Sequence, residues 1–304
     1  MNGVLIIDKP AGLTSHDVVN RLRRILHQRA VGHLGTLDPS ATGVLPLVLG
    51  NLTRLAQFYL SSEKTYQGVI RFGFATDTYD ADGEPLSPEQ QVEVSLEQLR
   101  NLAKNFVGRI EQLPPPFSAK KIHGVAAYKL ARKRQPVALN PVQVEIKEFA
   151  IVDLDGARAT FEARVGSGTY MRSVAHDMGQ RLGCGAHLES LRRTALAEFA
   201  LAGSHTLEAV EAAERQGIVQ DLLVHPRRLL PDMPSVAVPE EGAARIRSGR
   251  TVNLPELSRA RRLKVFYGQN ELIAIATRVA GTLFHPGIVF ATDPSPMPAH
   301  AGRE

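Results

Sequence analysis

The chain has 304 residues, 43% of them hydrophobic, with a formal net charge of +5 and an isoelectric point near 9.4. This length predicts one large domain plus a small one, and the apolar content is sufficient for a packed core, which excludes a disordered chain. The basic charge favours an anionic partner if the cations gather in a patch.

The single cysteine, Cys184, excludes an internal disulfide and is typical of a reducing compartment, so we expect a cytoplasmic location. The first apolar run follows no basic region, and a run of about 18 apolar residues occurs nowhere. We therefore expect neither a signal peptide nor a membrane span. A monomer is expected, because no dimerisation pattern is visible.

Residues 4–10, VLIIDKP, form a short apolar run that ends in charge and proline, which predicts a buried strand. Lys9, at the end of this strand, is interpreted first as a solvated lysine. A helix is expected next, because Thr14 and Ser15 offer N-cap oxygens and apolar residues follow at helical spacing.

Residues 32–50, GHLGTLDPSATGVLPLVLG, place one carboxylate, Asp38, in a tight loop with three glycines and then continue into an apolar, strand-like segment. Pro39 fixes its own φ and pushes Asp38 towards an extended backbone, while the glycines permit unusual conformations. From the spacing alone, Asp38 is either an aimed functional acid or a turn-capping residue. The glycines do not match a phosphate-binding loop, because no Lys-Ser, Lys-Thr or G-x-G-x-x-G pattern is present.

Alternation over residues 64–73 predicts a strand that carries Tyr66 near its start, where a tyrosine is usually a core or interface residue. The acidic segment TDTYDADGE, residues 76–84, partly fits a calcium loop. Thr78 occupies the first ligand position, however, and prolines disturb the pattern, so a turn between strands is predicted. A Ser-x-x-Gln capping box opens a predicted helix over residues 95–108.

The charge gathers in residues 113–137, where three prolines lead into a stretch without acids. Its cations are Lys120, Lys121, Lys129, Arg132, Lys133 and Arg134. A solvated helix face is the simple interpretation, but interleaved aromatic residues favour contact with RNA.

Residues 142–149 and 158–165 alternate and predict two antiparallel strands, followed by a glycine-rich turn and a helix within residues 166–183. Arg172 lies at the start of this helix, where the helix dipole disfavours a cation, so a carboxylate or phosphate partner is expected. His176 and Asp177 do not share a helix face and lack further ligands, so no metal site is predicted.

LESLRRTAL, residues 188–196, sets Arg192 and Arg193 beside an apolar stretch. From about Pro231 the character changes, because MPSVAVPEEGA is linker-like. Residues 236–290 then predict short strands rich in arginine, and the residues from 292 onward predict a disordered tail.

The motifs DKPAGLTS, GHLGTLDPSATGVLP, KTY, GTYMR and LRR occur in collinear order from about Gly3 to about Phe199. This order resembles the TruB family of tRNA pseudouridine synthases, which act on uridine 55 in the T loop. The resemblance implies an α+β pseudouridine synthase fold: a mixed, mostly antiparallel sheet flanked by helices, with an inserted thumb loop. It further implies a catalytic domain over 1–232, the thumb at 113–137, a small β-rich PUA-like RNA-binding domain over 233–291 and a disordered tail over 292–304.

The resemblance also assigns catalytic roles. Asp38 matches the family's catalytic acid, and Arg172 matches the arginine that pairs with it. Tyr66 matches the tyrosine that stacks on the target uracil, and it is a candidate for the base that removes the C5 proton.

Binding roles follow in the same way. His33 matches the residue that enters the T loop in place of the extruded uridine, Tyr170 supports the pocket, and Leu191 lines the pocket for uracil. The expected RNA contacts are Lys120, Lys121, Lys129, Arg132, Arg192 and Arg193.

The expected reaction breaks the glycosidic bond of a flipped uridine and rejoins the base through C5. It involves no redox step and loses no group, so neither a cofactor nor a metal is expected. The alternative is a non-catalytic tRNA-binding or folding chaperone, which would require none of Asp38, Tyr66 and Arg172. A nucleic-acid glycosidase, which would release free base, fits less well, because glycoside hydrolysis usually needs two carboxylates and only one essential acid is found.

Overall fold

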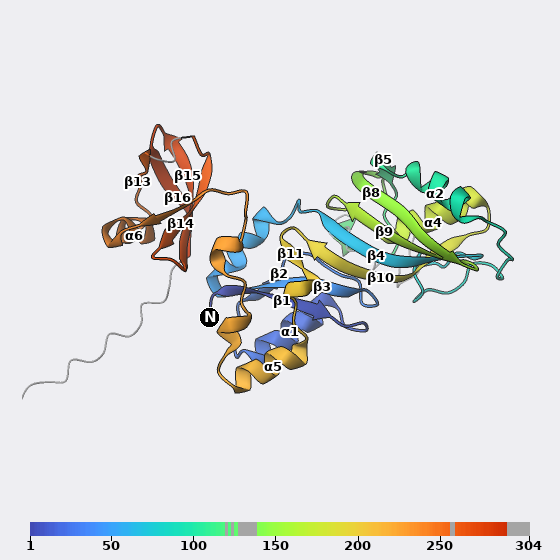
Figure 1. The fold of residues 1–304 in the computed structure, drawn as a ribbon, viewed down its shortest axis with the longest axis horizontal. Coiled ribbons are helices and arrows are strands. Elements are labelled where there is room, and N and C mark those ends of the chain that lie inside the picture. The colour runs from blue at the N-terminus through green and yellow to red at the C-terminus, as the bar shows by residue number, and fades with distance from the viewer. Residues whose placement is uncertain (119–120, 123–124, 127–138, 256–258, 291–304) are drawn as a thin grey trace, which may run out of the picture.

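The computed structural model describes residues 1–118, 121–122, 125–126, 139–255 and 259–290. Its elements form a large N-terminal sheet with helices and a smaller C-terminal sheet at one end of an elongated molecule (Figure 1). No helix within these residues is long and apolar enough to cross a membrane.

The large sheet is mixed and mostly antiparallel, as predicted. Its central order is β1-β3-β10-β4-β9-β8-β5, with β2 paired to β3 and β11 paired to β10. Only the pairing of β10 with β3 is parallel among these ladders. The strands are β1 (Gly3–Lys9), β2 (Val31–His33), β3 (Thr42–Leu49), β4 (Lys64–Phe72), β5 (Gly108–Gln112), β8 (Val142–Asp155), β9 (Arg158–Val165), β10 (Ala186–Leu196) and β11 (Phe199–Ala200).

Both faces of the sheet are buried where β1 and β3 lie, which explains their continuous apolar sequences. Leu5 and Leu47 belong to a core shared with the helices, whereas Val4 and Val48 belong to a second cluster on the opposite face. The helices of the first core are α1 (Ser15–Ile25), α2 (Leu96–Lys104), α4 (Met171–Leu182) and α5 (Leu207–Arg215). The 3₁₀ helix η1 (Gly50–Phe58) contributes to the second cluster.

The predicted capping residues are confirmed. Thr14 accepts from the backbone of Asp17, whose carboxylate accepts from Thr14 in return, and Ser95 and Gln98 form the same reciprocal box at α2. The predicted helix over 95–108 is shorter in the structure. It ends at Lys104, because Gly108 adopts φ +105° and begins β5.

The small sheet has the order β12-β14-β15-β16-β13, with α6 packed on it. Its elements are β12 (Ser235–Val238), α6 (Glu240–Arg247), β13 (Val252–Asn253), β14 (Arg262–Tyr267), β15 (Glu271–Ala280) and β16 (Leu283–Val289). The prediction of a linker at MPSVAVPEEGA is wrong. The segment forms β12 and the start of α6, because SVAV pairs in parallel with β14 over a length too short to show a period.

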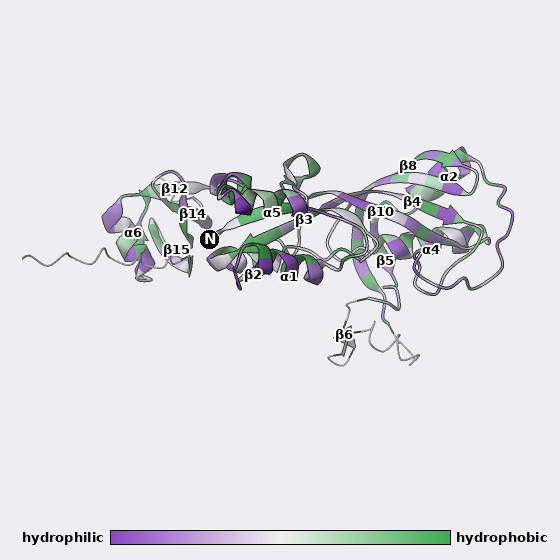
Figure 2. Cartoon of the chain, turned by 90° about the horizontal axis from the view of Figure 1, so that it is seen from below, coloured by the Kyte–Doolittle hydropathy of each residue, from purple (hydrophilic) through white to green (hydrophobic). Residues whose placement is uncertain are grey.

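The thumb stretch is described only in part. The short strands β6 (Lys121–Ile122) and β7 (Val125–Ala126) pair with each other, and Figure 2 shows β6 standing away from the large sheet. Lys120, Lys129 and Arg132 lie outside the described residues, as do the side chain of Lys121 and the predicted tail at 292–304.

Candidate active site

The loop between β2 and β3 that carries Asp38 is held by buried polar side chains. The Lys9 ammonium donates to the carbonyls of Pro39, Leu13 and Pro10 at 3.0, 2.7 and 2.9 Å. Lys9 is fully buried, so its interpretation as a solvated lysine is wrong. Burial lowers the pKa of Lys9 from 10.5 to about 8. A buried cation held by three carbonyls ties Pro39, the residue after Asp38, to the turn between β1 and α1.

Arg193 holds the other side of this loop from the sheet. Its guanidinium donates to the carbonyls of Gly35 at 3.0 Å, Thr36 at 3.2 Å and Val44 at 2.7 Å. The side chain is fully buried at the centre of β10, which leaves none of it open to RNA. The predicted RNA contact of Arg193 is therefore corrected. It is a positioning residue for the Asp38 loop.

Gly43 allows β3 to approach β10 at this point. Its φ is +99°, and a Cβ there would lie 2.2 Å from the carbonyl oxygen of Arg193. No L-side chain fits such an approach without moving the backbone. The glycine therefore sets the distance between the loop that carries Asp38 and the strand that carries Arg193.

Asp38 and Arg172 form the expected ion pair. The Arg172 Nε lies 3.0 Å from Oδ2 of Asp38, and Nη2 donates to Oδ1 at 3.2 Å. The Arg172 side chain is only 6% exposed, whereas the Asp38 side chain is 40% exposed. The pair therefore presents an open carboxylate on a buried guanidinium. Two contacts from a planar fork fix the direction of the acid as well as its charge.

Asp80 is a second carboxylate on Arg172. Its Oδ2 lies 3.4 Å from Nη1 of Arg172, which also donates to the carbonyl of Thr78 at 3.3 Å. Burial raises the pKa of Asp80, and a hydrogen bond from Thr78 and the charge of Arg172 oppose that shift. The acidic segment first compared with a calcium loop is thus a turn. Its Asp80 carboxylate faces Nη1 of Arg172, whereas Asp38 contacts Nε and Nη2.

Five predicted residues line one cavity of about 290 Å³. They are Asp38, Tyr66, Tyr170, Arg172 and Leu191. They come from the β2–β3 loop, from β4 and β10, and from the turn that begins α4. The volume is close to the lower end of small-ligand sites, which suits one flat base.

Tyr66 lies on β4 between β9 and β10, opposite Ala163 and Arg193. It is 7% exposed, and burial raises the pKa of its hydroxyl, while the charge of Arg193 and a hydrogen bond with it lower that pKa. The hydroxyl is therefore protonated near neutral pH in the free protein. An aromatic face at this position can stack on a flat base, whereas a tyrosine hydroxyl that accepts a proton must first lose its own.

Tyr170 precedes α4 and is clamped through its backbone. Gln112, on β5, accepts from the Tyr170 N–H at 2.8 Å and donates to its carbonyl at 3.0 Å. Burial raises the pKa of the Tyr170 hydroxyl, and the neighbouring Ser118 side chain offsets part of this rise in pKa. The clamp fixes the entry to the helix that carries Arg172.

Besides Arg193, two predicted residues in the described part of the chain lie outside this cavity. His33 ends β2, half-buried, with its Nδ1 unpartnered among the described residues, and burial lowers its pKa. Arg192 lies on the surface, where its Nη2 donates to Asp8 at 2.7 Å. The cavity thus contains the residues expected to bind the base and react with it, whereas His33 and Arg192 lie outside it.

Three further residues at this site were missed by sequence reasoning. Asp80 supports Arg172, Lys64 lines the cavity, and Leu60 lines it while 74% exposed. Burial and the charge of Arg193 lower the pKa of Lys64 to about 8. The sequence signal for Asp80 was the TDTYDADGE segment itself, whose acids needed a cation from elsewhere in the chain.

The mixed sheet, and the pair of an open aspartate with a buried arginine, are the fold and the site expected of a pseudouridine synthase. A family model described as the N-terminal domain of TruB family pseudouridylate synthase matches residues 23–171, and one for the tRNA pseudouridylate synthase B C-terminal domain matches residues 172–231. The chain belongs to the TruB family.

Named relatives cover nearly the whole chain. The tRNA pseudouridine synthase B of Solibacter usitatus is 49% identical over 292 residues, which cover 95% of this chain and 100% of that protein. That of Dehalococcoides mccartyi is 39% identical over 300 residues, covering 98% of each. Among solved structures, a Cbf5-Nop10-Gar1 complex has a TM-score of 0.71 at 24% identity, covering 95% of this chain and 85% of that chain. This last likeness concerns the fold alone.

Proposed function

We propose that this chain isomerises uridine to pseudouridine in tRNA, at position 55 in the T loop. The observation that carries the proposal is the open Asp38 carboxylate held by the buried Arg172 guanidinium at a cavity of base size. The tRNA substrate is supported by family membership and by the printed names of relatives that cover the whole chain.

The target uridine leaves its loop before it reacts, because a stacked base would not reach Asp38. Tyr66 and Leu191 replace part of the lost stacking with an aromatic face and an apolar side chain. His33, at the end of β2, fills the place that the base leaves in the T loop. These roles are binding roles and require no change in protonation.

Asp38 then serves the rearrangement in one of two ways. Its carboxylate attacks the ribose or the base, or it takes a ribose proton to give a glycal. In either case the N1–C1′ bond breaks, the uracil turns and C5 bonds to C1′, while the bond to Asp38 breaks or the ribose proton returns from Asp38. The C5 proton then leaves and N1 gains one. Arg172 keeps Asp38 aimed throughout. Tyr66 is our candidate for the group that takes the C5 proton, and Arg193 is the neighbour that favours ionisation of its hydroxyl.

The remaining assignments concern the whole chain. We propose residues 1–232 as the catalytic domain and residues 233–291 as a PUA-like RNA-binding domain. Lys120, Lys121, Lys129 and Arg132 of the thumb, with Arg192, contact the RNA backbone. We further propose a monomer that works with tRNA in the cytoplasm, without a cofactor or metal, because the reaction exchanges no electrons and loses no group.

Position-resolved mapping of pseudouridine in an unmodified tRNA transcript tests this function. We expect pseudouridine at position 55 alone, and none in a transcript that carries cytidine there. Modification elsewhere with position 55 untouched would contradict the T-loop assignment. Release of free uracil would instead indicate a glycosidase.

A further inference from the structure

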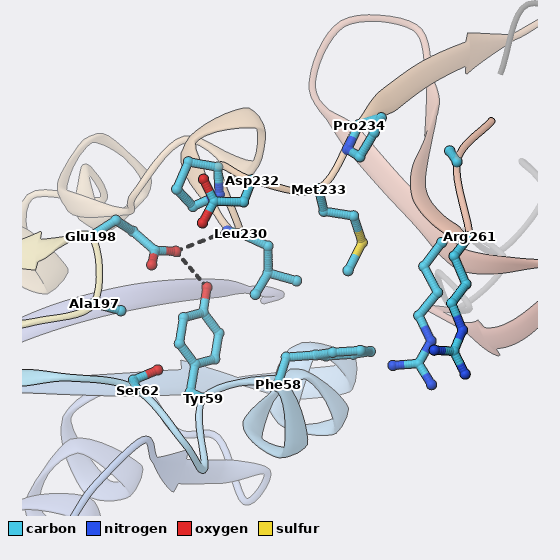
Figure 3. Close-up of a pocket in the computed structure, with 13 residues that line it drawn as sticks. Phe58, Tyr59, Ser62, Ala197, Glu198, Leu230, Asp232, Met233, Pro234 and Arg261 are labelled. Carbon is cyan, nitrogen blue, oxygen red and sulfur yellow. Dashed lines mark hydrogen bonds between the residues drawn. The ribbon is translucent and has the colours of Figure 1, made fainter. Parts of the chain in front are cut away.

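A second cavity, of about 680 Å³, lies between the large sheet and the small sheet (Figure 3). The catalytic side contributes Phe58 and Tyr59 after η1, the connecting segment contributes Leu230 and Met233, and Arg261 and Arg262 contribute from the start of β14. None of these residues has a role in the isomerisation described above. The volume lies within the range of sites that hold small organic ligands.

The floor of this cavity is fixed by hydrogen bonds. Oε1 of Glu198 accepts from the Tyr59 hydroxyl at 2.6 Å and from the Leu230 N–H at 2.8 Å. Tyr59 is 1% exposed, and burial and Glu198 both raise its pKa, so its hydroxyl remains a donor. These bonds tie the end of η1 to the segment that leads into the small sheet. The cavity is therefore formed before any ligand arrives.

The lining combines an aromatic face with free cations. Figure 3 shows the Phe58 ring below the Met233 side chain, with guanidinium groups of the small sheet to the right of both. The Arg262 guanidinium lies 5.9 Å from the centroid of Phe58. Arg261 and Arg262 are exposed, and neither forms an ion pair with another described residue. Asp232 lies across the cavity as a hydrogen-bond acceptor.

This set of groups matches one class of ligand. A flat base stacks on an aromatic ring, its phosphate pairs with arginine, and a carboxylate accepts from a base amino group. An apolar peptide would leave both arginines without partners, and a free anion would leave the apolar wall uncovered.

The same short segment of chain contributes to both cavities. Phe58, Tyr59 and Ser62 line the second cavity, whereas Leu60 and Lys64 line the first. Leu191 on β10 also lines the first cavity, and Ala197, which follows β10, lines the second. Residues 58–64 and the end of β10 therefore connect the walls of the two cavities.

We propose that this cavity holds a second, unpaired nucleotide of the bound RNA, with its base on Phe58 and its phosphate at Arg261 and Arg262. The identity of the RNA rests on the proposed function. The chemistry of the site does not, because it requires only a base and a phosphate.

The binding test uses the full chain with Asp38→Asn, to prevent turnover, and a labelled tRNA transcript. Phe58→Ala and the double variant Arg261→Gln/Arg262→Gln should each raise Kd about tenfold, the effect of one lost stacked base or its phosphate contacts. The control Arg24→Gln/Arg215→Gln removes the same charge from exposed positions on α1 and α5 and should change Kd less than about twofold. With Asp38 restored, KM should rise by the same factor and kcat should stay constant. Equal Kd values for the cavity variants and the control would overturn the site.

A second measurement does not depend on deleting a contact. The photoreactive residue benzoyl-phenylalanine is introduced in place of Met233, and the variant is used once its melting temperature equals that of the parent. It should cross-link one nucleotide of the transcript other than the target uridine. Cross-links spread over many nucleotides, or none, would overturn the site. If the parent binds through this cavity but makes no pseudouridine, the proposed function fails and the nucleotide site stands. If it makes pseudouridine with unaltered affinity in the cavity variants, the reverse holds.

Discussion

Three buried cations surround the Asp38 loop and hold it in different ways. Lys9 and Arg193 donate to backbone carbonyls, whereas Arg172 faces the carboxylates of Asp38 and Asp80. The acid itself remains 40% exposed. An open reactive group on a buried, hydrogen-bonded support is the arrangement that a preorganised site requires.

The sequence predicts the reacting residues at this scale better than their supports. The position of Arg172 at a helix start predicted an anionic partner, and the resemblance to the family identified that partner as Asp38. For the segment around Asp80 the sequence predicted only an acidic turn, because its partner, Arg172, lies far along the chain. Arg193 looked like a surface arginine beside Arg192, and only the pairing of β10 with β3 and β4 shows that these successive residues lie in a strand and face opposite sides of the sheet.

Replacement of Arg172 tests the support directly. Arg172→Met leaves Asp80 buried without its cation and should reduce the free energy of unfolding by about 3 kcal/mol. It should lower kcat about 100-fold, because Asp38 loses its aim. Arg172→Lys keeps the charge without the fork and should recover part of both losses.

Arg215→Met is the matched control. Arg215 pairs with Glu211 on the surface of α5, so its loss should change the free energy of unfolding by about 0.5 kcal/mol. Urea unfolding and single-turnover kinetics at saturating RNA measure the two effects. Equal kcat values for Arg172→Met and the parent would remove Arg172 from the account.

At the scale of elements, the close approach of β3 to β10 builds the site. Apolar runs predicted β1 and β3, and alternation predicted β4 and β9. Their order in the sheet could not be predicted by period alone, because β10 joins β3 to β4 across more than a hundred residues of chain.

Two glycines with positive φ distinguish the cost of backbone strain from the cost of a steric clash. Gly43→Ala would place Cβ 2.2 Å from the Arg193 carbonyl, whereas Gly12 has φ +84° and nothing within 4 Å of an added Cβ. We expect Gly12→Ala to cost about 1 kcal/mol through backbone strain and Gly43→Ala about 3 kcal/mol or more. Urea unfolding of both variants measures the difference. Equal losses would show that β3 and β10 are not held as closely as described.

Lys9 predicts a pH dependence of stability. Burial lowers its pKa from 10.5 in the unfolded chain to about 8 in the folded one. Between these values the unfolded chain binds more protons, so the contribution of Lys9 to the free energy of unfolding rises with pH from about 8 to 10.5 and is lost as pH falls through 8.

The comparison of the parent with Lys9→Met isolates this contribution from the other lysines and tyrosines. The difference in unfolding free energy, parent minus variant, should increase by about 1 to 3 kcal/mol across that window. A difference that stays constant with pH would mean that the pKa of Lys9 is the same in both states.

At the scale of the whole molecule, our proposal gives the RNA three regions to contact, which are the large sheet, the small sheet and the basic stretch of residues 113–137. The sequence predicted a small C-terminal β-rich part, and the structure confirms a separate five-stranded sheet there. It did not predict the cavity between the sheets, since that cavity is lined by η1, the residues around Met233 and the start of β14, which meet only in the folded chain.

The thumb carries the electrostatic prediction. Lys120→Ala/Lys121→Ala should flatten the slope of log binding constant against log salt by about one unit for each lost phosphate contact. Lys104→Ala, on α2, is the control and should leave the slope unchanged. Fluorescence anisotropy of a labelled T-arm stem-loop provides the slopes. Parallel lines for the thumb variant and the parent would remove these lysines from the RNA surface.

The most direct measurement is the release of tritium from C5 of uridine in a T-arm stem-loop, with chelator present, by the parent and by Asp38→Asn. The account predicts release by the parent and none by the variant, which should still bind the RNA. Binding by both proteins without release from either would contradict it. The chain would then be an RNA-binding protein in which the Asp38 loop is only scaffold.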